Sequence, residues 1–454
     1  MKTRCILAFL LSFVAPCAPA QTIVLDNARL IIGDGRVLEQ ASILIEDGMI
    51  NAVGSSDELL RRGGEVIDLS GKTVIPALID GHAHLGYQGP ETWGAQSYGR
   101  ENLIENLQRY AYYGFGAVFS AGSDPATLMS EIQTEHAAGE FVGARPLFAV
   151  GMAPPGSGPN NRFLPHALNV ERKTGMRILR GLSDPGQARQ QVREVAAEGA
   201  SFIKLWVDDR GGSQEKLSPE IYRAAAAEAI EQGLKVFVHQ QSPADMQPLL
   251  DAGVHGFLHG RIGPGFDQVL AQQTARAGAF VVPNLGLSEL RREAIGDDPF
   301  LRETHSIGAA RPMTAAASER VDNPTPDPAV EAALREGFAQ LLDQGVDIVL
   351  GTDAGAVPYH PFGYTGHREL EIYVRLGMTP MQALQAGTSV AARHLDLTNM
   401  GLLAPGYSAD LLVLSANPLE DIRNTQAIDM VYLGGQALDR EALSATWLGT
   451  SVNE

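Results

Sequence analysis

The sequence lacks any apolar run long enough to span a bilayer, which takes about 20 residues. The one apolar run near the N-terminus, Ile6–Val14, is short, and it follows the basic residues Lys2 and Arg4. The small residues Ala18-Pro19-Ala20 come after it. This layout predicts a secretory signal peptide over residues 1–20, with cleavage after Ala20, and disfavours the alternative of a membrane anchor.

Cysteine is also nearly absent, since the chain has two, Cys5 and Cys17, and both lie within the predicted signal peptide. A lipoprotein signal ending at Cys17 fits poorly because Pro16 directly precedes it. The mature protein would then have no disulfide and no thiolate metal ligand, so any metal ion must be held by nitrogen and oxygen donors. An exported protein without cysteine is predicted to be secreted to a bacterial periplasm, with release from the cell as the alternative.

Basic residues are few: 35 Lys and Arg stand against 53 Asp and Glu, which gives a formal net charge of −18. Loss of the signal peptide would make the charge about −20. Such a charge argues against nucleic acid and anionic membranes as partners. The composition leaves the oligomeric state open, and a homo-oligomer is compatible with it.

The chain is long enough for one large barrel and a smaller appendage. Residues 21–73 predict short strands separated by Gly/Asp turns, and strands return after residue 397 in Asp410–Leu414 and Met430–Leu433. We expect these two pieces, 21–73 and 397–454, to form one split β-sandwich.

Between them, residues 74–396 predict an α/β fold in which apolar strands alternate with Ala-rich helical segments. The eight predicted strands are Val74–Asp80, Ala117–Ala121, Leu147–Gly151, Phe202–Val207, Lys235–His239, Gly256–His259, Phe280–Pro283 and Asp347–Thr352. This pattern predicts a parallel (β/α)₈ barrel of the TIM type rather than the alternative, a doubly wound open sheet. Residues 287–328 show no clear element, which is typical of a lid or substrate loop, with a disordered insertion as the alternative.

Polar residues at the C-terminal ends of barrel strands form the active site of such a fold. The first predicted strand is followed by His82 and His84, whose side chains share one side because alternate residues of a strand do so. The two imidazoles can bind one metal ion.

The fourth predicted strand carries Lys204 within an apolar run, where an unpaired lysine is costly. It could extend to solvent at the strand end or pair with Asp208 or Asp209. The functional interpretation is reaction with carbon dioxide to form a carbamate, which a lysine with a pKa depressed by burial can undergo. The carboxylated lysine could bridge two metal ions.

Three more strands end in potential ligands: His239, His259 and Asp353. Either histidine alone is more often a hydrogen-bonded core residue. Asp353 closes a Val/Ile/Leu strand and can both bind metal and accept a proton from water.

We predict two divalent ions, one held by His82, His84, Asp353 and Lys204 and the other by Lys204, His239 and His259. A hydroxide would bridge the ions. The donors fit zinc, and manganese, cobalt and iron fit as well.

These residues, with Leu350–Gly355, Pro405–Leu411 and Asn417-Pro418-Leu419, resemble the amidohydrolase superfamily. The resemblance covers nearly the whole mature chain and is strongest to the branch related to imidazolonepropionases and Xaa-Pro or Xaa-Arg/Lys dipeptidases. It implies metal binding at all six positions and a proton-shuttling role for Asp353. Relatives often have Glu-His-Gly at strand six, whereas this chain has Leu258-His259-Gly260, which weakens transfer of a particular substrate.

The resemblance also separates subtypes. Mononuclear deaminases of the superfamily typically lack the strand-four lysine, so Lys204 favours a binuclear hydrolase. We expect hydrolysis of a C–N amide bond in a small peptide or an N-acyl amino acid, so the expected partner is a small-molecule or dipeptide substrate. The alternatives are the same centre acting on a lactone, carbamate or phosphotriester, and a non-catalytic relative. Other polar residues near the strand ends, Asp208 and Arg210 among them, are more typically structural than substrate contacts.

Overall fold

A computed structural model of the chain describes residues 22–156, 158, 163–260, 262–290, 293–318 and 328–449. The predicted signal peptide, residues 1–20, lies outside these ranges. Within them, no helix combines the length and the apolar character that crossing a bilayer requires.

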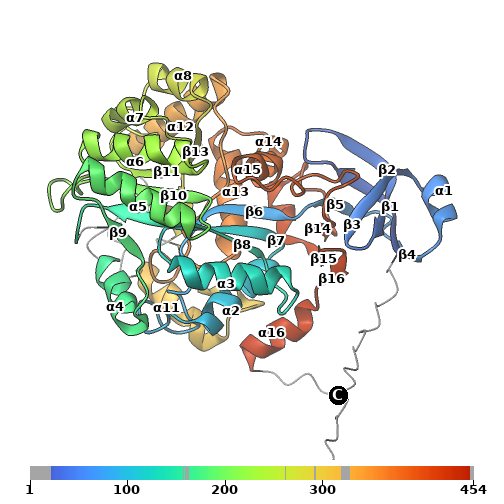
Figure 1. Cartoon of the computed structure of the whole chain (residues 1–454). Helices are drawn as coiled ribbons and strands as arrows, with labels where there is room; N and C mark the ends of the chain where they lie inside the picture. The colour runs from blue at the N-terminus through green and yellow to red at the C-terminus, as the bar shows by residue number, and fades with distance from the viewer. Residues whose placement is uncertain are drawn as a thin grey trace, which may run out of the picture.

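A parallel barrel forms the larger part of the molecule (Figure 1). Its strands, in spatial order, are β6 (Leu78–Ala83), β7 (Phe115–Ala121), β8 (Arg145–Ala153), β10 (Phe202–Val207), β11 (Lys235–Gln240), β12 (Gly256–Leu258) and β13 (Phe280–Val282). The short β9 (Leu179–Gly181) pairs with β8.

Residues 347–354 occupy the eighth position of the barrel. They form isolated parallel bridges, Ile348 to Val281 of β13 and Ala354 to Ala83 of β6, rather than the regular strand that the sequence predicts. Backbone hydrogen bonds on both sides, Val349 N to Val281 O at 3.0 Å and Gly81 N to Leu350 O at 2.8 Å, close the ring. The predicted TIM-type barrel is therefore confirmed.

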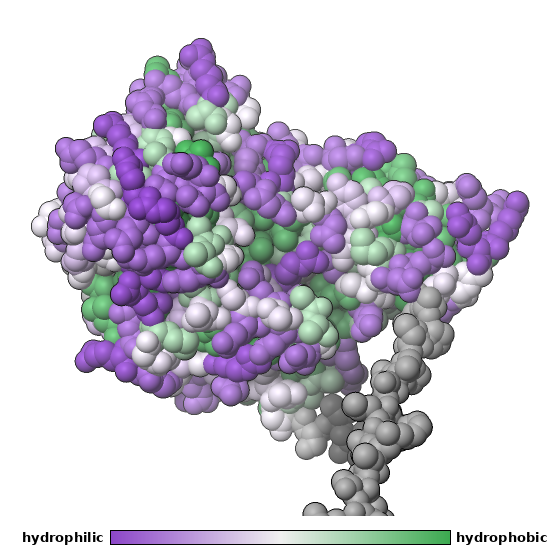
Figure 2. Space-filling view, in the orientation of Figure 1, coloured by the Kyte–Doolittle hydropathy of each residue, from purple (hydrophilic) through white to green (hydrophobic). Residues whose placement is uncertain are grey.

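An outer layer of helices covers the barrel strands. The helices are α2 (Arg100–Tyr112), α3 (Ala126–Ala137), α4 (Leu164–Thr174), α5 (Pro185–Ala197), α6 (Pro219–Glu231), α7 (Pro243–Leu250), α8 (Gln268–Arg276), α12 (Pro328–Asp343), α13 (Tyr364–Leu376), α14 (Pro380–Ala386) and α15 (Ser389–His394). Proline in the first turn and the Asp184 side chain, which accepts from Gly186 N and Gln187 N, fix the start of α5. Hydrophilic residues cover most of α5 and α6 on the face seen in Figure 2, as an amphipathic outer layer requires.

Strands from both ends of the chain form a second, mixed sheet beside the barrel (Figure 1). Its order is β16 (Gln436–Ala437), β15 (Ile428–Leu433), β14 (Leu411–Leu414), β5 (Thr73–Pro76), β1 (Thr22–Ile31), β2 (Val37–Glu46) and β3 (Met49–Ser55), and β4 (Glu65–Asp68) pairs with β1. The helix α1 (Ser56–Leu59) and the 3-10 turn η1 (Leu60–Arg62) follow β3, and η4 (Ile422–Gln426) and α16 (Arg440–Leu448) flank the C-terminal strands. The predicted β unit shared by the two chain ends is confirmed.

The predicted first barrel strand, Val74–Asp80, is wrong as a single element. The structure divides it at Ala77 into β5, which belongs to the mixed sheet, and β6, which belongs to the barrel. Ala77 N donates to Asp410 O, whereas Leu78 N donates to Gly114 O, so the chain passes from one sheet to the other at this point. Both halves are apolar and buried, which is why the sequence reads as one strand.

The region that the sequence leaves without elements, residues 287–328, is largely helical where the structure describes it. It contains η3 (Ile295–Asp297), α10 (Pro299–Arg302) and α11 (Ile307–Ser318), after the short α9 (Gly286–Glu289). Leu301 is fully buried, and the Tyr113 hydroxyl donates to Phe300 O at 3.1 Å. These contacts attach the region to the barrel helices, and its role as a lid or substrate loop stays a prediction.

A layer of phenylalanine rings fills the barrel below the candidate site. The ring centroids of Phe119 and Phe202, of Phe202 and Phe237, and of Phe237 and Phe280 lie 5.0–5.3 Å apart. Because alternate residues of a strand share one side, Lys204 and His239 stand one layer above Phe202 and Phe237. The core thus supports these two side chains from beneath.

Candidate metal centre

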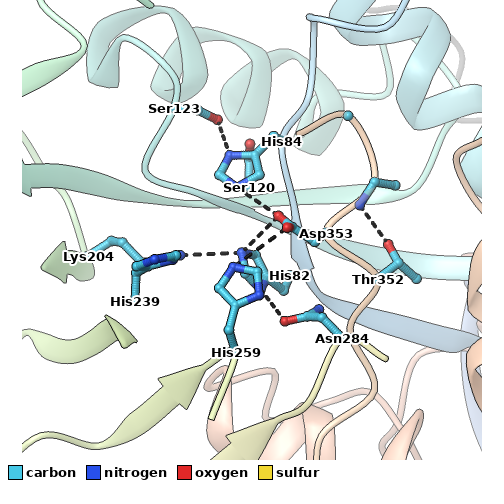
Figure 3. A network of polar contacts seen from close by, with 12 residues as sticks. His82, His84, Ser120, Ser123, Lys204, His239, His259, Asn284, Thr352 and Asp353 are labelled. Atoms are coloured by element: carbon cyan, nitrogen blue, oxygen red, sulfur yellow. Dashed lines mark hydrogen bonds and ion pairs between the residues drawn. The ribbon is translucent and has the colours of Figure 1, made fainter. Parts of the chain in front are cut away.

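Six side chains meet at the C-terminal ends of the barrel strands, and we refer to them as the histidine cluster (Figure 3). They are His82 and His84 from β6, Lys204 from β10, His239 from β11, His259 directly after β12, and Asp353 at the eighth position of the barrel. All are buried except His259, whose side chain is 11% exposed. The structure therefore brings together every residue that the sequence predicts as a ligand.

The Asp353 carboxylate faces three imidazoles. Oδ1 lies 3.1 Å from His84 Nε2 and 3.4 Å from His82 Nε2, and Oδ2 lies 3.6 Å from His259 Nε2. The ligand atoms of His82, His259 and Asp353 all lie within 4.8 Å of one another, as those of a shared metal ion must. Asp353 Oδ1 is buried and has no hydrogen-bond partner among the described residues. A buried carboxylate oxygen in this state is suited to binding a cation.

Lys204 lies on the other side of His82, with its Nζ 3.3 Å from His82 Nε2. The side chain is fully buried, and no carboxylate oxygen of the described residues lies within 4.0 Å of its Nζ. Burial lowers the pKa of Lys204 to about 7, and the Asp353 carboxylate only partly opposes that shift. A lysine buried without a neighbouring anion is unfavourable for folding alone, which suggests a functional reason for its retention.

His239 completes the row of imidazoles. Its ring centroid lies 4.8 Å from that of His259, which in turn lies 4.7 Å from that of His82. His239 Nε2 contacts Asp208 Oδ2 at 3.1 Å, so this nitrogen already has an anionic neighbour. The cluster therefore has one side centred on Asp353 and a second side that includes Asp208.

Two polar residues fix the orientation of the β6 histidines. His82 Nδ1 pairs with Asn284 Oδ1 at 2.9 Å, and His84 Nδ1 pairs with Ser123 Oγ at 2.8 Å. With Nδ1 engaged, each ring directs Nε2 toward Asp353, the arrangement found around metal-binding histidines. The sequence interpretation missed Asn284 and Ser123. Both follow barrel strands, β13 and β7. They could have been found by considering the polar residues at the C-terminal end of every barrel strand, because these residues form the active site of such a fold.

Asp80 connects the two strand ends that carry His82, His84 and Asp353. Its fully buried carboxylate accepts from Thr352 Oγ1 at 2.6 Å, the Tyr110 hydroxyl at 2.7 Å and His82 N at 3.0 Å. Burial raises the pKa of Asp80 to about 6, and these donors partly oppose the rise. Asp80 thereby holds the backbone of β6 against residues 352–353.

Several residues of the site have left-handed backbone conformations. The φ angles are 66° at His259, 59° at Asp353 and 51° at Asn284. Residues other than glycine seldom adopt such angles, and their concentration at one site is typical of functional positions. The same turns aim His259 and Asp353 inward where the strands end.

Comparison with known proteins gives consistent results. The model of the Amidohydrolase family matches residues 73–438. The imidazolonepropionase of Geobacillus thermodenitrificans is 28% identical over 90% of this chain and 92% of its own length. The ochratoxinase of Aspergillus niger is 24% identical over 93% of this chain and 88% of its own length. The crystal structure of a putative prolidase from Bifidobacterium longum is similar with a TM-score of 0.68, at 26% identity, over 94% of this chain and 99% of that one.

The family match spans the whole barrel and all six residues of the histidine cluster. It agrees with the group of His82, His259 and Asp353, whose ligand atoms lie close enough together to hold a metal ion. The chain belongs to the amidohydrolase family and is a metal-dependent hydrolase.

Proposed function

We propose that the protein is a two-metal amidohydrolase that cleaves a C–N amide bond in a small peptide or an N-acyl amino acid. The observation that carries this proposal is the position of Lys204. Its side chain is buried beside His82, in the same cluster as His239 and His259, and no carboxylate oxygen of the described residues lies within 4.0 Å of its Nζ. Addition of carbon dioxide to the neutral amine, with loss of one proton, would turn it into an anionic ligand.

The residues present fit two divalent ions. Asp353 Oδ1, buried without a hydrogen-bond partner among the described residues, and the Nε2 atoms around it supply one set of donors. His82, His84, Asp353 and carboxylated Lys204 would hold one ion, and carboxylated Lys204, His239 and His259 the other. Nitrogen and oxygen donors without sulfur favour zinc, and they also suit manganese, cobalt and iron. Binding at His239 Nε2 requires its 3.1 Å contact with Asp208 to open.

When bound, such ions lower the pKa of a water molecule and polarise the carbonyl group of a substrate. The contribution of Asp353 is to accept a proton from the attacking water at a carboxylate oxygen and to deliver it to the leaving nitrogen. Asn284 and Ser123 hold the rings of His82 and His84 in one orientation during this transfer. The phenylalanine layer below keeps water out of the barrel interior.

The similarity to a putative prolidase supports a peptide-type C–N bond. Because the same centre could also act on a lactone, carbamate or phosphotriester, the test is a substrate panel that contains all these classes with dipeptides and N-acyl amino acids. Metal analysis of the purified protein accompanies it. We expect about two equivalents of divalent metal and turnover of the amides. Full activity without metal, or turnover confined to lactones or phosphotriesters, would contradict the proposal.

We also propose that the protein is exported to a bacterial periplasm after removal of residues 1–20. The basic, apolar and small-residue segments of its N-terminus support this. Intact-mass measurement of the exported protein should give a chain that begins at Gln21.

A further inference from the structure

The turn after β10 holds an arginine at the edge of the histidine cluster. Arg210 N donates to Asp208 Oδ1 at 2.9 Å, and Arg210 Nε pairs with Asp208 Oδ2 at 2.7 Å. Gln214 Nε2 donates to Asp208 O at 2.8 Å and braces the turn from the other side. Asp208 thus fixes both the backbone and the side chain of Arg210.

The guanidinium reaches the cluster itself. Arg210 Nη2 lies 3.1 Å from His239 Nε2, the atom that Asp208 Oδ2 also contacts. The Asp208 side chain is 6% exposed, whereas that of Arg210 is 29% exposed. Arg210 therefore lies between the buried cluster and solvent, where a substrate would enter.

This arrangement is unfavourable for folding in two respects. A guanidinium stands beside the His239 imidazole and near the buried Lys204, at a site proposed to take divalent cations, and the Asp208 carboxylate opposes its charge. The φ angle of Arg210 is 53°, a conformation that costs a residue with a side chain more than it costs glycine. Glycine occupies the next two positions, 211 and 212. If position 210 served only to form the turn, glycine would adopt its left-handed conformation at a lower cost.

We propose that Arg210 binds the carboxylate of the substrate, so that the substrates are N-acyl amino acids or dipeptides with a free C-terminal carboxylate. This inference rests on the proposed function and narrows its substrate class. A guanidinium matches a carboxylate with two parallel hydrogen bonds, which a lysine cannot reproduce. Asp208 keeps Nε in place while the outer nitrogens of Arg210 turn from His239 to the substrate. The chain as a whole is strongly acidic and would repel an anionic substrate. The positive charge of Arg210 would offset this repulsion at the site.

The competing interpretation is that Arg210 only neutralises Asp208. A kinetic comparison separates the two. Metal-loaded wild type, Arg210→Gln and Arg210→Lys are assayed on a dipeptide and on its C-terminal primary amide, with the exposed Arg223→Gln as a matched control. Our proposal predicts a wild-type preference for the acid of about 10-fold to 100-fold in kcat/KM. In Arg210→Gln the ratio of kcat/KM for the acid to kcat/KM for the amide falls to about one, chiefly through a higher KM for the acid, and Arg210→Lys keeps part of the preference. An equal loss for both substrates, or a preserved preference, would overturn the proposal.

A binding measurement keeps this test independent of amide hydrolysis. Calorimetry with 4-phenylbutanoate and 4-phenylbutanol, neither of which contains a C–N bond, compares an anionic with a neutral ligand. Arg210→Gln should weaken binding of the carboxylate by about tenfold and leave the alcohol unchanged. If that result holds while no amide is hydrolysed, the proposed function fails and the role of Arg210 stands. If amides are hydrolysed and the variant binds the carboxylate as tightly as wild type, the role of Arg210 fails and the function stands.

Discussion

Two regions of this molecule that contain buried histidines differ in the partners of the two ring nitrogens. At the mouth of the barrel, His82 and His84 each use Nδ1 for a neutral partner and direct Nε2 to Asp353. In the contact between α13 and η4, His367 pairs Nδ1 with Thr425 Oγ1 at 2.9 Å and Nε2 with Tyr113 O at 2.8 Å. All three histidines are fully or nearly fully buried, so burial alone does not distinguish a candidate ligand from a core residue.

The comparison suggests a separation of roles. Where both nitrogens have neutral partners, the histidine stabilises the packing of two elements. Where one nitrogen converges with others on a carboxylate, the arrangement prepares a cation site at some cost to folding. Substitutions in the histidine cluster should therefore reduce metal content and turnover, whereas substitution of His367 should reduce stability.

The largest loss of turnover is expected from Lys204→Ala. Without the carboxylated side chain neither proposed ion keeps its full ligand set, so metal content should fall and turnover should be abolished. Metal analysis and kinetics on the purified variant measure both. Lys216→Ala, which removes a half-exposed lysine paired with Asp245, serves as the control. A Lys204→Ala protein with two bound ions and full activity would refute the role of Lys204 as the ligand shared by the two ions.

Asp353→Asn should cause the next largest loss. The amide has nearly the same shape but cannot accept the proton, so kcat should fall by about 10²-fold to 10⁴-fold at saturating metal. Circular dichroism should show an unchanged fold. A kcat near the wild-type value would mean that another group moves the proton.

Asn284→Ala removes the hydrogen-bond partner that orients His82 and leaves the predicted ligands themselves unchanged. Loss of the 2.9 Å contact frees the ring to rotate, and metal affinity should fall by roughly 10-fold to 100-fold. Competition with a chelator measures this affinity, and the exposed Asn51→Ala provides the comparison. If affinity is unchanged, Asn284 does not orient the ligand.

His367→Gln should leave turnover at saturating metal unchanged and alter stability instead. Burial lowers the pKa of His367 from 6.5 to about 4, so between these values the unfolded chain binds a proton that the native protein does not. The free energy of unfolding should then fall by about 3 kcal/mol as pH is lowered from 6.5 to 4. Denaturant titrations across this range should show a shallower decline in the variant. A decline as steep as that of wild type would assign the effect to other groups.

The sequence predicted most of the barrel because its strands are apolar runs with clear ends, and β10 coincides with the predicted Phe202–Val207. It failed where local pattern does not determine pairing. Val74–Asp80 reads as one apolar strand, but its two halves pair with strands far apart in the chain, β14 and β7. Residues 287–328 contain short helices around Pro299 and Pro312, which interrupt the periodicity that identifies a helix.

The candidate site shows the same limit. His82, His84 and Asp353 follow strands and could be found from their positions alone. Asn284 lies 202 residues from His82, and nothing in the local sequence of either residue indicates their contact. The role proposed for Arg210 depends on the 3.1 Å approach to His239, which only the folded structure brings about.

The pairing of β5 with β14 has a consequence for the order of folding. Thr73–Pro76 aligns antiparallel with Leu411–Leu414, so this ladder cannot form until nearly the entire chain has left the ribosome. Until then β5, which continues into the strand that carries His82, has an unpaired edge open to other chains. A nascent or C-terminally truncated protein would therefore be prone to aggregation. Completion of the small sheet thus depends on residues that all lie outside the histidine cluster.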